Sequence, residues 1–193
     1  KMIYYLKMGR KLNLDDPRTM NEKLQWLKLH NRKPEYTTMV DKILVKEYVS
    51  EKIGPQYVVP LLGVWDDVED IDFESLPEKF VLKSNHSGNN LGVVICHDKA
   101  DFDFAKAKRK LKKSLKLDIY KVYREWPYKN IPRKIICEKL LKNSDGSQLL
   151  EYNVFCFNGV PKYFKVGSVL ADGSHAKDFY DINWNHLDMK TGA

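Results

Sequence analysis

Residues 79–96, KFVLKSNHSGNNLGVVIC, indicate the fold more clearly than any other stretch of the chain. Two short apolar runs, 79–83 and 92–96, enclose eight small or polar residues, which is the pattern of two strands joined by a loop. Lys83 closes the first run, and the residues after it have little bulk or tolerate left-handed backbone. This stretch therefore predicts a β-hairpin whose loop can bring backbone amides close to an anion.

The segment before residue 57 is predicted to be helical. Thr19 and Glu22 have the spacing of a capping box, in which hydroxyl and carboxylate each satisfy an unpaired backbone amide at a helix start. A second signal of this form, Thr38 to Asp41, predicts a helix that runs to about residue 52 and stops at Gly54.

Downstream of residue 57, short apolar runs alternate with turn residues. Strands are predicted at 57–65, 134–141, 149–157, 160–169 and 178–184. Pro60 places the first of these at a sheet edge or a kink, and Asn158-Gly159 predicts a type I′ hairpin turn. A lysine-rich amphipathic helix is predicted between 101 and 117.

This order of elements predicts an α+β fold made of two α+β subdomains with a cleft between them. We place a helical segment at 1–56, a subdomain containing the hairpin at 57–130, and a partial antiparallel-sheet subdomain at 131–193. The chain stops at Ala193 without an obvious closing element, so we expect the fold to be truncated at its C-terminus.

Composition excludes several classes of protein. The 193 residues are 43% hydrophobic and 31% charged, which disfavours disorder, collagen-like repeats and a disulfide scaffold. No apolar run approaches the roughly 20 residues that cross a bilayer, so no transmembrane segment and a cytoplasmic location are expected. The net charge of +7 favours anionic partners. Cys96, Cys137 and Cys156 each lie in an apolar run and are expected to be buried, reduced thiols.

Lys83 and its loop form the first candidate binding site. Ser87, Gly88, Asn89 and Asn90 can turn backbone amides toward a phosphate, and the lysine supplies a point charge. A surface hairpin tip that happens to follow a lysine has the same pattern, so both interpretations stand.

Two further positions allow a functional and an ordinary interpretation. Lys42 lies in the first turn of the predicted second helix, where a solvated helix lysine is the ordinary explanation. Glu138 and Lys139 place two charges in the apolar run 135–141, as a nucleotide hinge requires, since adenine needs polar backbone at its edge and apolar side chains over its faces. An edge strand with one solvated side gives the same pattern.

The order of these pieces carries a resemblance to a known family. Asp41-Lys42 at a helix start, Val59-Pro60, the strand that ends in Lys83, and the run 135–141 follow one another as in the N-terminal half of an ATP-grasp nucleotide site. More narrowly, the chain resembles the TupA-like, or teichuronopeptide-biosynthesis, ATP-grasp family over essentially its whole length. The strings that carry this likeness are LNL (12–14), NEKLQWL (21–27), REWPYKNI (124–131) and FCFNG (155–159).

The resemblance implies an ATP-grasp ligase that joins a carboxylate to an amine through an acyl phosphate, in surface polysaccharide or teichuronopeptide synthesis. ATP with Mg²⁺ would be the cofactor, and a small molecule or cell-wall polymer the substrate. The implied site places Lys42 and Lys83 on the phosphates, His86, Ser87 and Gly88 in a flexible loop above them, and Glu138, Lys139, Leu140 and Leu141 on the adenine. We also expect peripheral contact with membrane-bound polysaccharide machinery and no nucleic-acid partner.

Two departures from the family pattern concern activity. Asn153 stands where the resemblance implies a phosphate-facing lysine before the FCFNG string. The acidic magnesium ligands of such a site come from a later segment, and nothing after Trp184 offers it. We therefore name no metal ligand.

Two rival functions remain. A glycosyltransferase could use a D-x-D pair for a metal and a nucleotide sugar, and both 70–72 and 101–103 have that spacing, although each also fits a helix start. A non-enzymatic anion- or nucleic-acid-binding domain could use the basic helix. Arg124 and Arg133 could meet a substrate carboxylate bidentately, and Arg124 is the catalytic candidate beside Lys83.

Overall fold

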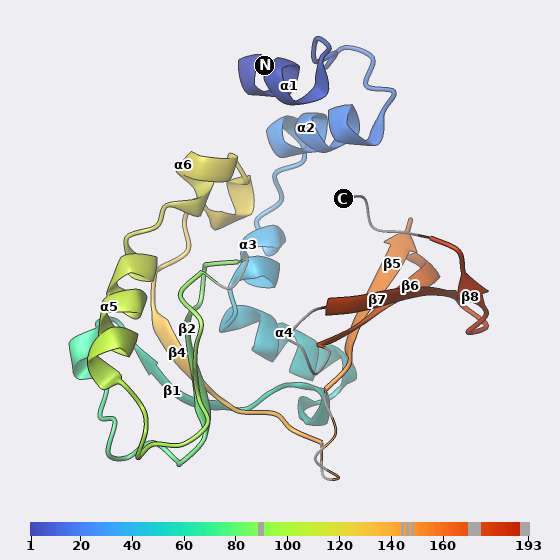
Figure 1. Ribbon diagram of the computed structural model, residues 1–193. Coiled ribbons are helices and arrows are strands. Elements are labelled where there is room, and N and C mark those ends of the chain that lie inside the picture. Colours follow the sequence, from blue (N-terminus) through green and yellow to red (C-terminus); the bar gives the residue numbers. More distant parts are fainter. Residues whose placement is uncertain (89–90, 144, 146, 148, 170–174, 190–193) are drawn as a thin grey trace. The chain divides into compact units, whose positions relative to one another are not determined.

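The chain divides into two compact units, Lys1–Leu140 and Leu141–Ala193, in the computed structural model (Figure 1). The structure describes all residues except 89–90, 144, 146, 148, 170–174 and 190–193. Each unit has its own antiparallel four-stranded sheet. The mixture of helices and antiparallel sheets agrees with the predicted α+β class.

Helices occupy the beginning of the first unit, as predicted. They are α1 (Met2–Met8), α2 (Met20–His30), α3 (Glu35–Val40), α4 (Leu44–Ile53) and a 3-10 turn at Pro55–Tyr57. The capping box of Thr19 and Glu22 is confirmed at the start of α2. The second capping signal is wrong, because Thr38 lies inside α3 and Asp41 follows it. None of the helices in the described chain has both the length and the apolar character needed to cross a bilayer.

The first sheet contains β1 (Leu61–Trp65), β2 (Phe80–Ser84), β3 (Val94–Cys96) and β4 (Ile135–Lys139) in the order β1-β4-β2-β3. The predicted hairpin is confirmed as β2 and β3. The edge position expected from Pro60 is confirmed for β1. Strand β4, by contrast, lies between β1 and β2. The edge-strand interpretation of Glu138 is therefore wrong, and 135–139 belongs to the first sheet rather than with the strands that follow residue 141.

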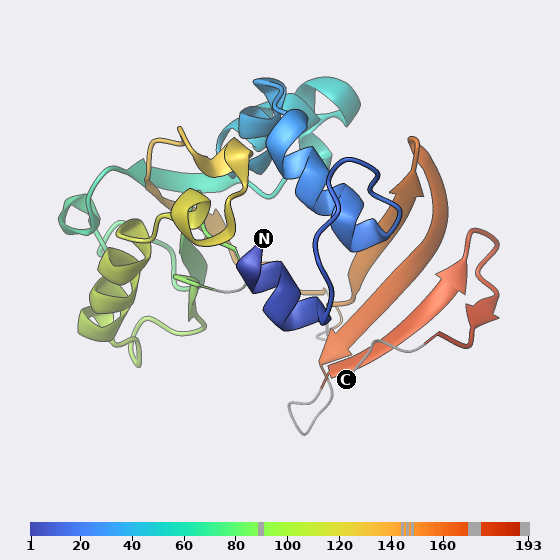
Figure 2. The same ribbon diagram turned by 90° about the horizontal axis from the view of Figure 1, so that it is seen from above.

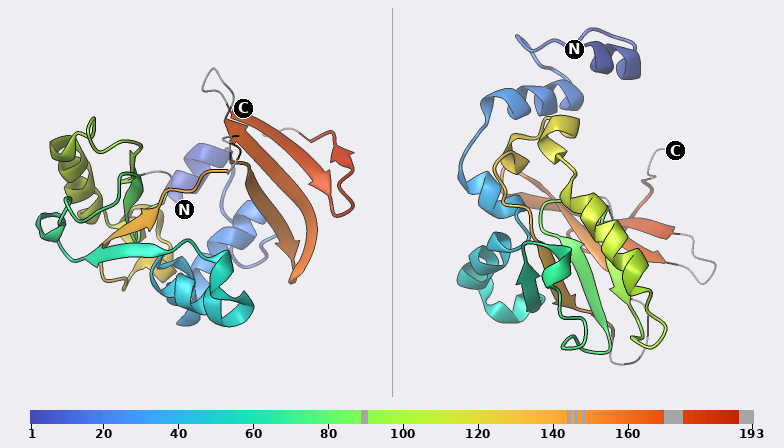
Figure 3. Two further views of the ribbon diagram at one scale, coloured as in Figure 1. Left: turned by 90° about the horizontal axis from the view of Figure 1, so that it is seen from below. Right: turned by 90° about the vertical axis from the view of Figure 1, so that its left-hand side faces the viewer.

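The two faces of this sheet differ in character. Phe80 and Leu82 of β2 point into an apolar cluster that also includes Leu111 of α5 (Phe104–Leu115). Figure 3 shows α5 lying over β2 and β3, as its amphipathic pattern requires. The opposite face carries the side chains of Lys83 and Glu138. Between α5 and β4 lie α6 (Ile119–Tyr123) and a 3-10 turn at Trp126–Tyr128.

The second unit is a meander of β5 (Glu151–Phe157), β6 (Val160–Val169), β7 (His175–Asp181) and β8 (His186–Leu187). Asn158 and Gly159 have φ angles of 51° and 77°, which confirms the hairpin turn between β5 and β6 (Figure 2). The predicted strand 178–184 ends at Asp181. Its last residues instead form a turn in which Trp184 has a φ of 65°.

Two of the three thiols are buried as expected. Cys96 and Cys137 are both fully buried in the first sheet, and burial raises the pKa of Cys137 to about 12. Cys156 on β5 is exposed, so the expectation of three buried thiols is wrong for this residue. It lies on the edge strand β5, whose side chains are largely exposed, and an apolar run alone does not show which side is covered.

Candidate functional site

Glu138, on an inner strand of the first sheet, forms ion pairs with two lysines. Val81 of β2 pairs with Glu138 of β4, so Lys83, two residues along β2, shares a face with Glu138. The Lys83 Nζ lies 2.5 Å from Glu138 Oε2, and the Lys46 Nζ of α4 lies 2.9 Å from Glu138 Oε1. Each carboxylate oxygen thus has its own ammonium partner.

These three charges are largely removed from water. The side-chain exposure is 9% for Glu138, 13% for Lys46 and 21% for Lys83. Burying charges costs several kcal/mol per ion before pairing, so the net contribution of a buried ion pair to stability is small. A buried cluster of charges of this kind is therefore a candidate for a functional site.

Lys42 lies beside this cluster and has different partners. Its Nζ donates to the backbone carbonyls of Asn85, at 3.3 Å, and of Ser87. Burial and the nearby Lys83 charge lower the pKa of Lys42, while Glu138 and Asp41 oppose the shift. The interpretation as a solvated helix lysine is wrong, because Lys42 lies in the turn between α3 and α4 and is half-buried.

Asn85 fixes the position of this turn. Its Nδ2 donates to Asp41 Oδ1 at 3.1 Å and to the carbonyl of Pro132 at 2.9 Å, and its Oδ1 accepts from the backbone of Lys134 at 2.9 Å. The Asn85 carbonyl also accepts from the Lys42 backbone at 3.1 Å. This fully buried amide therefore joins the end of β2, the approach to β4 and the turn that carries Lys42.

The loop after β2 begins as a packed structure. Ser84 to Ser87 are buried, so the surface-tip interpretation is wrong for these residues. The Ser87 hydroxyl lies 2.5 Å from the Ser84 hydroxyl and donates to the Leu91 carbonyl. Gly88 is exposed, and a Cβ built on it would meet nothing within 4 Å. The predicted amide donors Asn89 and Asn90 lie outside the described residues.

His86 is buried with one ring nitrogen satisfied. Its Nε2 lies 3.1 Å from the Leu117 carbonyl, whereas Nδ1 has no hydrogen-bond partner among the described residues. Burial is the main cause that lowers the pKa of His86, and the Arg133 and Lys42 charges act in the same direction. Burial and the neighbouring cations therefore favour the neutral form of this imidazole.

The remaining predicted residues make none of the hydrogen bonds or ion pairs described above. Lys139 is exposed at the end of β4, Leu140 is half-buried, and Leu141 begins the second unit with 49% exposure. Arg124 is exposed with a left-handed φ of 55°, and its guanidinium lies 5.9 Å from the Tyr120 ring centroid. Asn153 donates to Glu151 Oε1 on β5.

Lys46 and Asn85 were not predicted as site residues. Lys46 follows Lys42 by four residues, a spacing that places two lysines on the same face of a helix. This was the available signal that they belong to one site, but a solvated helix face has the same spacing. Nothing in the sequence around Asn85 shows that its amide reaches Asp41 and Pro132, because both partners are more than forty positions away.

The features behind the rival functions have structural roles. Asp103 caps α5 by accepting from the Lys106 backbone at 2.8 Å, and Asp72 accepts from the Glu74 backbone at 3.1 Å. Across the described ranges, no group of three or more histidines, cysteines or acidic residues could hold a metal ion. On the basic helix, Lys108 and Lys112 pair with Glu69. Arg133, just before β4, pairs with Asp118 at 3.2 Å.

The comparisons with known proteins show the family of the chain. The family model described as TupA-like ATPgrasp matches residues 22–192. The chain belongs to the TupA-like ATP-grasp family. The matched range includes every lysine of the site, Asn85, His86 and Glu138. No curated protein and no solved structure matches the chain.

The residues present fit part of what an ATP-grasp protein binds. The site offers three ammonium groups against the carboxylates of Glu138 and Asp41, and an open glycine at the loop, which suits a polyphosphate. They do not fit Mg²⁺ equally well, because the described residues contain no cluster of acidic ligands beside the lysines. No step of the chemistry is therefore assigned to a metal.

Proposed function

We propose that this TupA-like ATP-grasp chain binds ATP and takes part in the ATP-dependent joining of a carboxylate to an amine. The observation that carries the proposal is Lys42, a half-buried ammonium held by two backbone carbonyls at the start of the loop after β2. Within the described chain it has no carboxylate at ion-pair distance. Its lowered pKa shows that burial and Lys83 disfavour the charge, and a phosphate would offset both effects.

The proposed binding roles follow the layout of the first unit. Lys42 and Lys83 would hold the phosphates, with Lys46 placing Glu138 and thereby Lys83. His86, Ser87 and Gly88 would form the fixed part of the loop above the phosphates. Glu138 and Lys139 are paired within β4, and the chain leaves the β ladder after Lys139, so the backbone of Leu140 and Leu141 would be available to the edge of adenine.

ATP would supply the phosphoryl group that makes the carboxylate reactive. A carboxylate oxygen attacks the γ-phosphorus, the bond to the β-phosphate oxygen breaks, and ADP leaves. The amine nitrogen then attacks the acyl carbon, inorganic phosphate departs, and the nitrogen loses a proton. The lysines would offset the charge on the phosphate oxygens during transfer. Arg124 is the candidate for the carboxylate substrate, since Arg133 is engaged by Asp118.

We further propose that this reaction belongs to surface polysaccharide or teichuronopeptide assembly, on the basis of the family alone. A nucleotide-dependent enzyme of this kind would act in the cytoplasm, on a small molecule or a cell-wall polymer. Peripheral contact with membrane-bound polysaccharide machinery would bring it to its polymer.

Calorimetric titration with ATP, with and without Mg²⁺, tests the nucleotide site. We expect saturable binding that Lys83→Ala weakens roughly tenfold, about 1.4 kcal/mol, because one charge contact to phosphate is lost. Lys110→Ala on exposed α5 is the matched control and should leave the affinity unchanged. Absence of ATP binding in the unmodified chain, or equal losses in both variants, would contradict the proposal.

The same titration separates the rival functions. Binding that follows total charge, falls steeply with salt and does not distinguish ATP from inorganic triphosphate would favour an anion-binding domain. A preference for a nucleotide sugar over ATP would favour the glycosyltransferase.

A further inference from the structure

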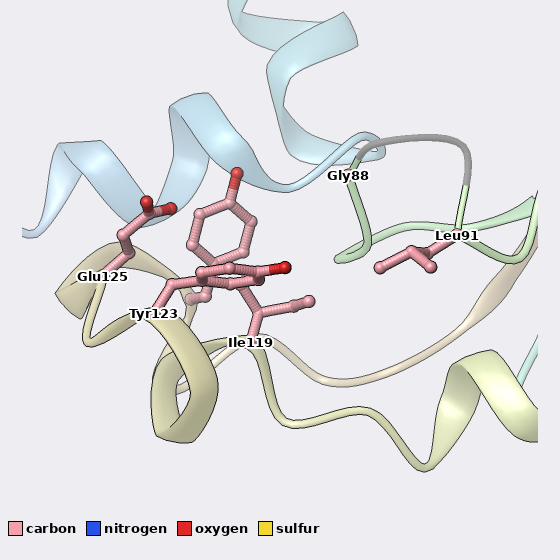
Figure 4. Close-up of a pocket in the computed structure, with 6 residues that line it drawn as sticks. Gly88, Leu91, Ile119, Tyr123 and Glu125 are labelled. Carbon is pink, nitrogen blue, oxygen red and sulfur yellow. The ribbon is translucent and has the colours of Figure 1, made fainter. Parts of the chain in front are cut away.

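A cavity in the first unit differs in electrostatic character from the lysine site. It encloses about 340 Å³ and is lined by Gly88, Leu91, Ile119, Tyr123, Glu125 and Tyr128 (Figure 4). Two of these residues, Gly88 and Leu91, belong to the loop after β2, so the cavity adjoins the proposed phosphate site. Its size suits a small polar molecule such as an amino acid or a single sugar.

The local backbone brings the polar lining residues together. Arg124 adopts a left-handed conformation after α6, and its N–H donates to the Tyr120 carbonyl at 2.8 Å. The chain therefore reverses between Tyr123 and Glu125. Figure 4 shows Tyr123 extending from α6 toward the side where Gly88 and Leu91 lie, with Glu125 on the other side.

Among the described residues, the lining contains a carboxylate and two phenols but no basic side chain. This is unusual in a chain with a net charge of +7. Lys28 of α2 braces the wall from outside, donating to the Tyr123 carbonyl at 3.1 Å and lying 3.5 Å from Glu125 Oε1. A carboxylate accepts about four hydrogen bonds, so one lysine at that distance leaves Glu125 with further acceptor capacity.

The chemistry of this lining favours a cation over an anion. Burial and the Glu125 charge raise the pKa of Tyr128, so the phenol stays protonated and the negative potential comes from the carboxylate. Aromatic rings attract ammonium groups through their faces, by about 0.5–1 kcal/mol at exposed sites. Carboxylate and tyrosine rings are thus the combination that selects an ammonium group.

We propose that this pocket binds the amine substrate of the ligation as its ammonium ion, with Glu125 as the charge partner and Tyr123 and Tyr128 as the aromatic walls. The proposal rests on the proposed ligase function, because it assigns the second substrate of that reaction. It also explains why a carboxylate pocket adjoins a lysine site: the two substrates carry opposite charges.

Matched pairs of small molecules test this assignment on the full chain. D-glucosamine and D-glucose differ in one ammonium group, and so do alaninamide and lactamide. Saturation-transfer NMR titrations, with and without ATP, should show that the ammonium member of at least one pair binds tenfold or more tightly than its hydroxyl counterpart. Equal binding within both pairs, or binding by neither ammonium compound, would overturn the proposal.

Substitutions then locate the binding. Glu125→Gln keeps the shape of the side chain and should weaken ammonium binding at least tenfold while changing hydroxyl binding less than twofold. Glu51→Gln, an exposed carboxylate on α4, is the control. Tyr123→Leu keeps the carboxylate and should weaken ammonium binding several-fold, which covers the case in which Glu125→Gln fails to fold. Unchanged ammonium binding in both pocket variants would overturn the proposal.

ATP titration of the same samples distinguishes the two ways of failing. If ATP binds and the ammonium preference is missing, the pocket assignment is wrong and the nucleotide site stands. If the ammonium preference depends on Glu125 but ATP does not bind, the pocket stands as an amine site and the ligase function fails.

Discussion

The first unit contains the same trio of charges in two settings. In the interior, Glu138 of β4 pairs with Lys83 of β2 and with Lys46 of α4. On the surface, Glu69 pairs with Lys108 and Lys112 of α5. The carboxylate side chain is 9% exposed in the first case and 54% in the second. Contact distances are similar, so the difference between the trios is the access of water.

This difference in water access distinguishes a structural ion-pair trio from a candidate binding site. The surface trio links α5 to the turn before β2, and its two lysines lower the pKa of Glu69 to about 2. Surface ion pairs are screened and contribute little to stability. The interior trio has lost most of its hydration. Lys46 connects α4 to β4, whereas Lys83 joins two strands that are already paired along five positions. The buried charge of Lys83 is therefore better explained by a ligand than by the fold.

Removing the interior carboxylate should produce the largest effect. Glu138→Gln leaves the Lys46 and Lys83 charges without a counter-charge, and we expect a loss of on the order of 3 kcal/mol in the free energy of unfolding. Urea denaturation measures it. Glu69→Gln removes the matching surface carboxylate and should shift the midpoint far less. Equal shifts in the two variants would mean that burial does not distinguish the trios.

Asn85→Ala should have the next largest effect. It removes three hydrogen bonds and leaves the Lys134 N–H and the Pro132 carbonyl without their partner, at a cost of about 2 kcal/mol. Thermal unfolding compares it with Asn130→Ala at an exposed position, which should be near neutral. Asn85→Ala should also weaken ATP binding, because the amide no longer holds Asp41, the neighbour of Lys42 in the turn. Unchanged ATP affinity would show that the turn holds Lys42 without this amide.

The sequence predicted those features that depend on neighbours in the chain. The capping box of Thr19 and Glu22 and the turn at Asn158-Gly159 are local, and both are confirmed. The signal at Thr38 and Asp41 has the same local form and is wrong. Asp41 Oδ1 instead accepts from the Ile43 backbone and from Asn85, a residue that only the folded chain brings near.

The candidate site was predictable only in part for the same reason. Lys83 was visible because a strand and a small-residue loop meet at it. The role of Lys46 could not be predicted, because it depends on an ion pair with Glu138, 92 positions away, and on β4 being an interior strand. Local patterns cannot show which strand lies in the middle of a sheet, and the burial of a lysine follows from that position.

A smaller effect should appear in the pH dependence of stability through His86. Its pKa is lowered from 6.5 in the folded chain, so the unfolded chain binds a proton more readily. The free energy of unfolding should therefore fall as the pH drops from about 7.5 to 5, because histidine in the unfolded chain takes up a proton with a pKa near 6.5. Arg133, Lys42 and Asp41 face this ring, and the two cations oppose its protonation.

His86→Gln tests this assignment, since the glutamine amide can still donate to the Leu117 carbonyl but does not titrate. Stability curves by urea denaturation at a series of pH values should be flatter for the variant in this window. An equally steep curve would place the titrating group elsewhere and would mean that the buried ring is not held neutral by its surroundings.

The smallest effect should come from the surface trio, in a different window. The pKa of Glu69 is lowered to about 2, so its contribution is present above the ordinary value of 4.5 and is lost as the pH falls toward 2. The difference in urea midpoint between the unmodified chain and Glu69→Gln should shrink over that range.

The same difference in urea midpoint should also shrink in 0.5 M NaCl at neutral pH, because exposed ion pairs are screened by salt. Glu138→Gln should keep its deficit in the same salt, since its partners are covered by protein. If salt reduced the loss of stability equally in both variants, water and ions would have to reach the interior trio. Its lysines would then be ordinary solvated cations, with no need of a bound anion.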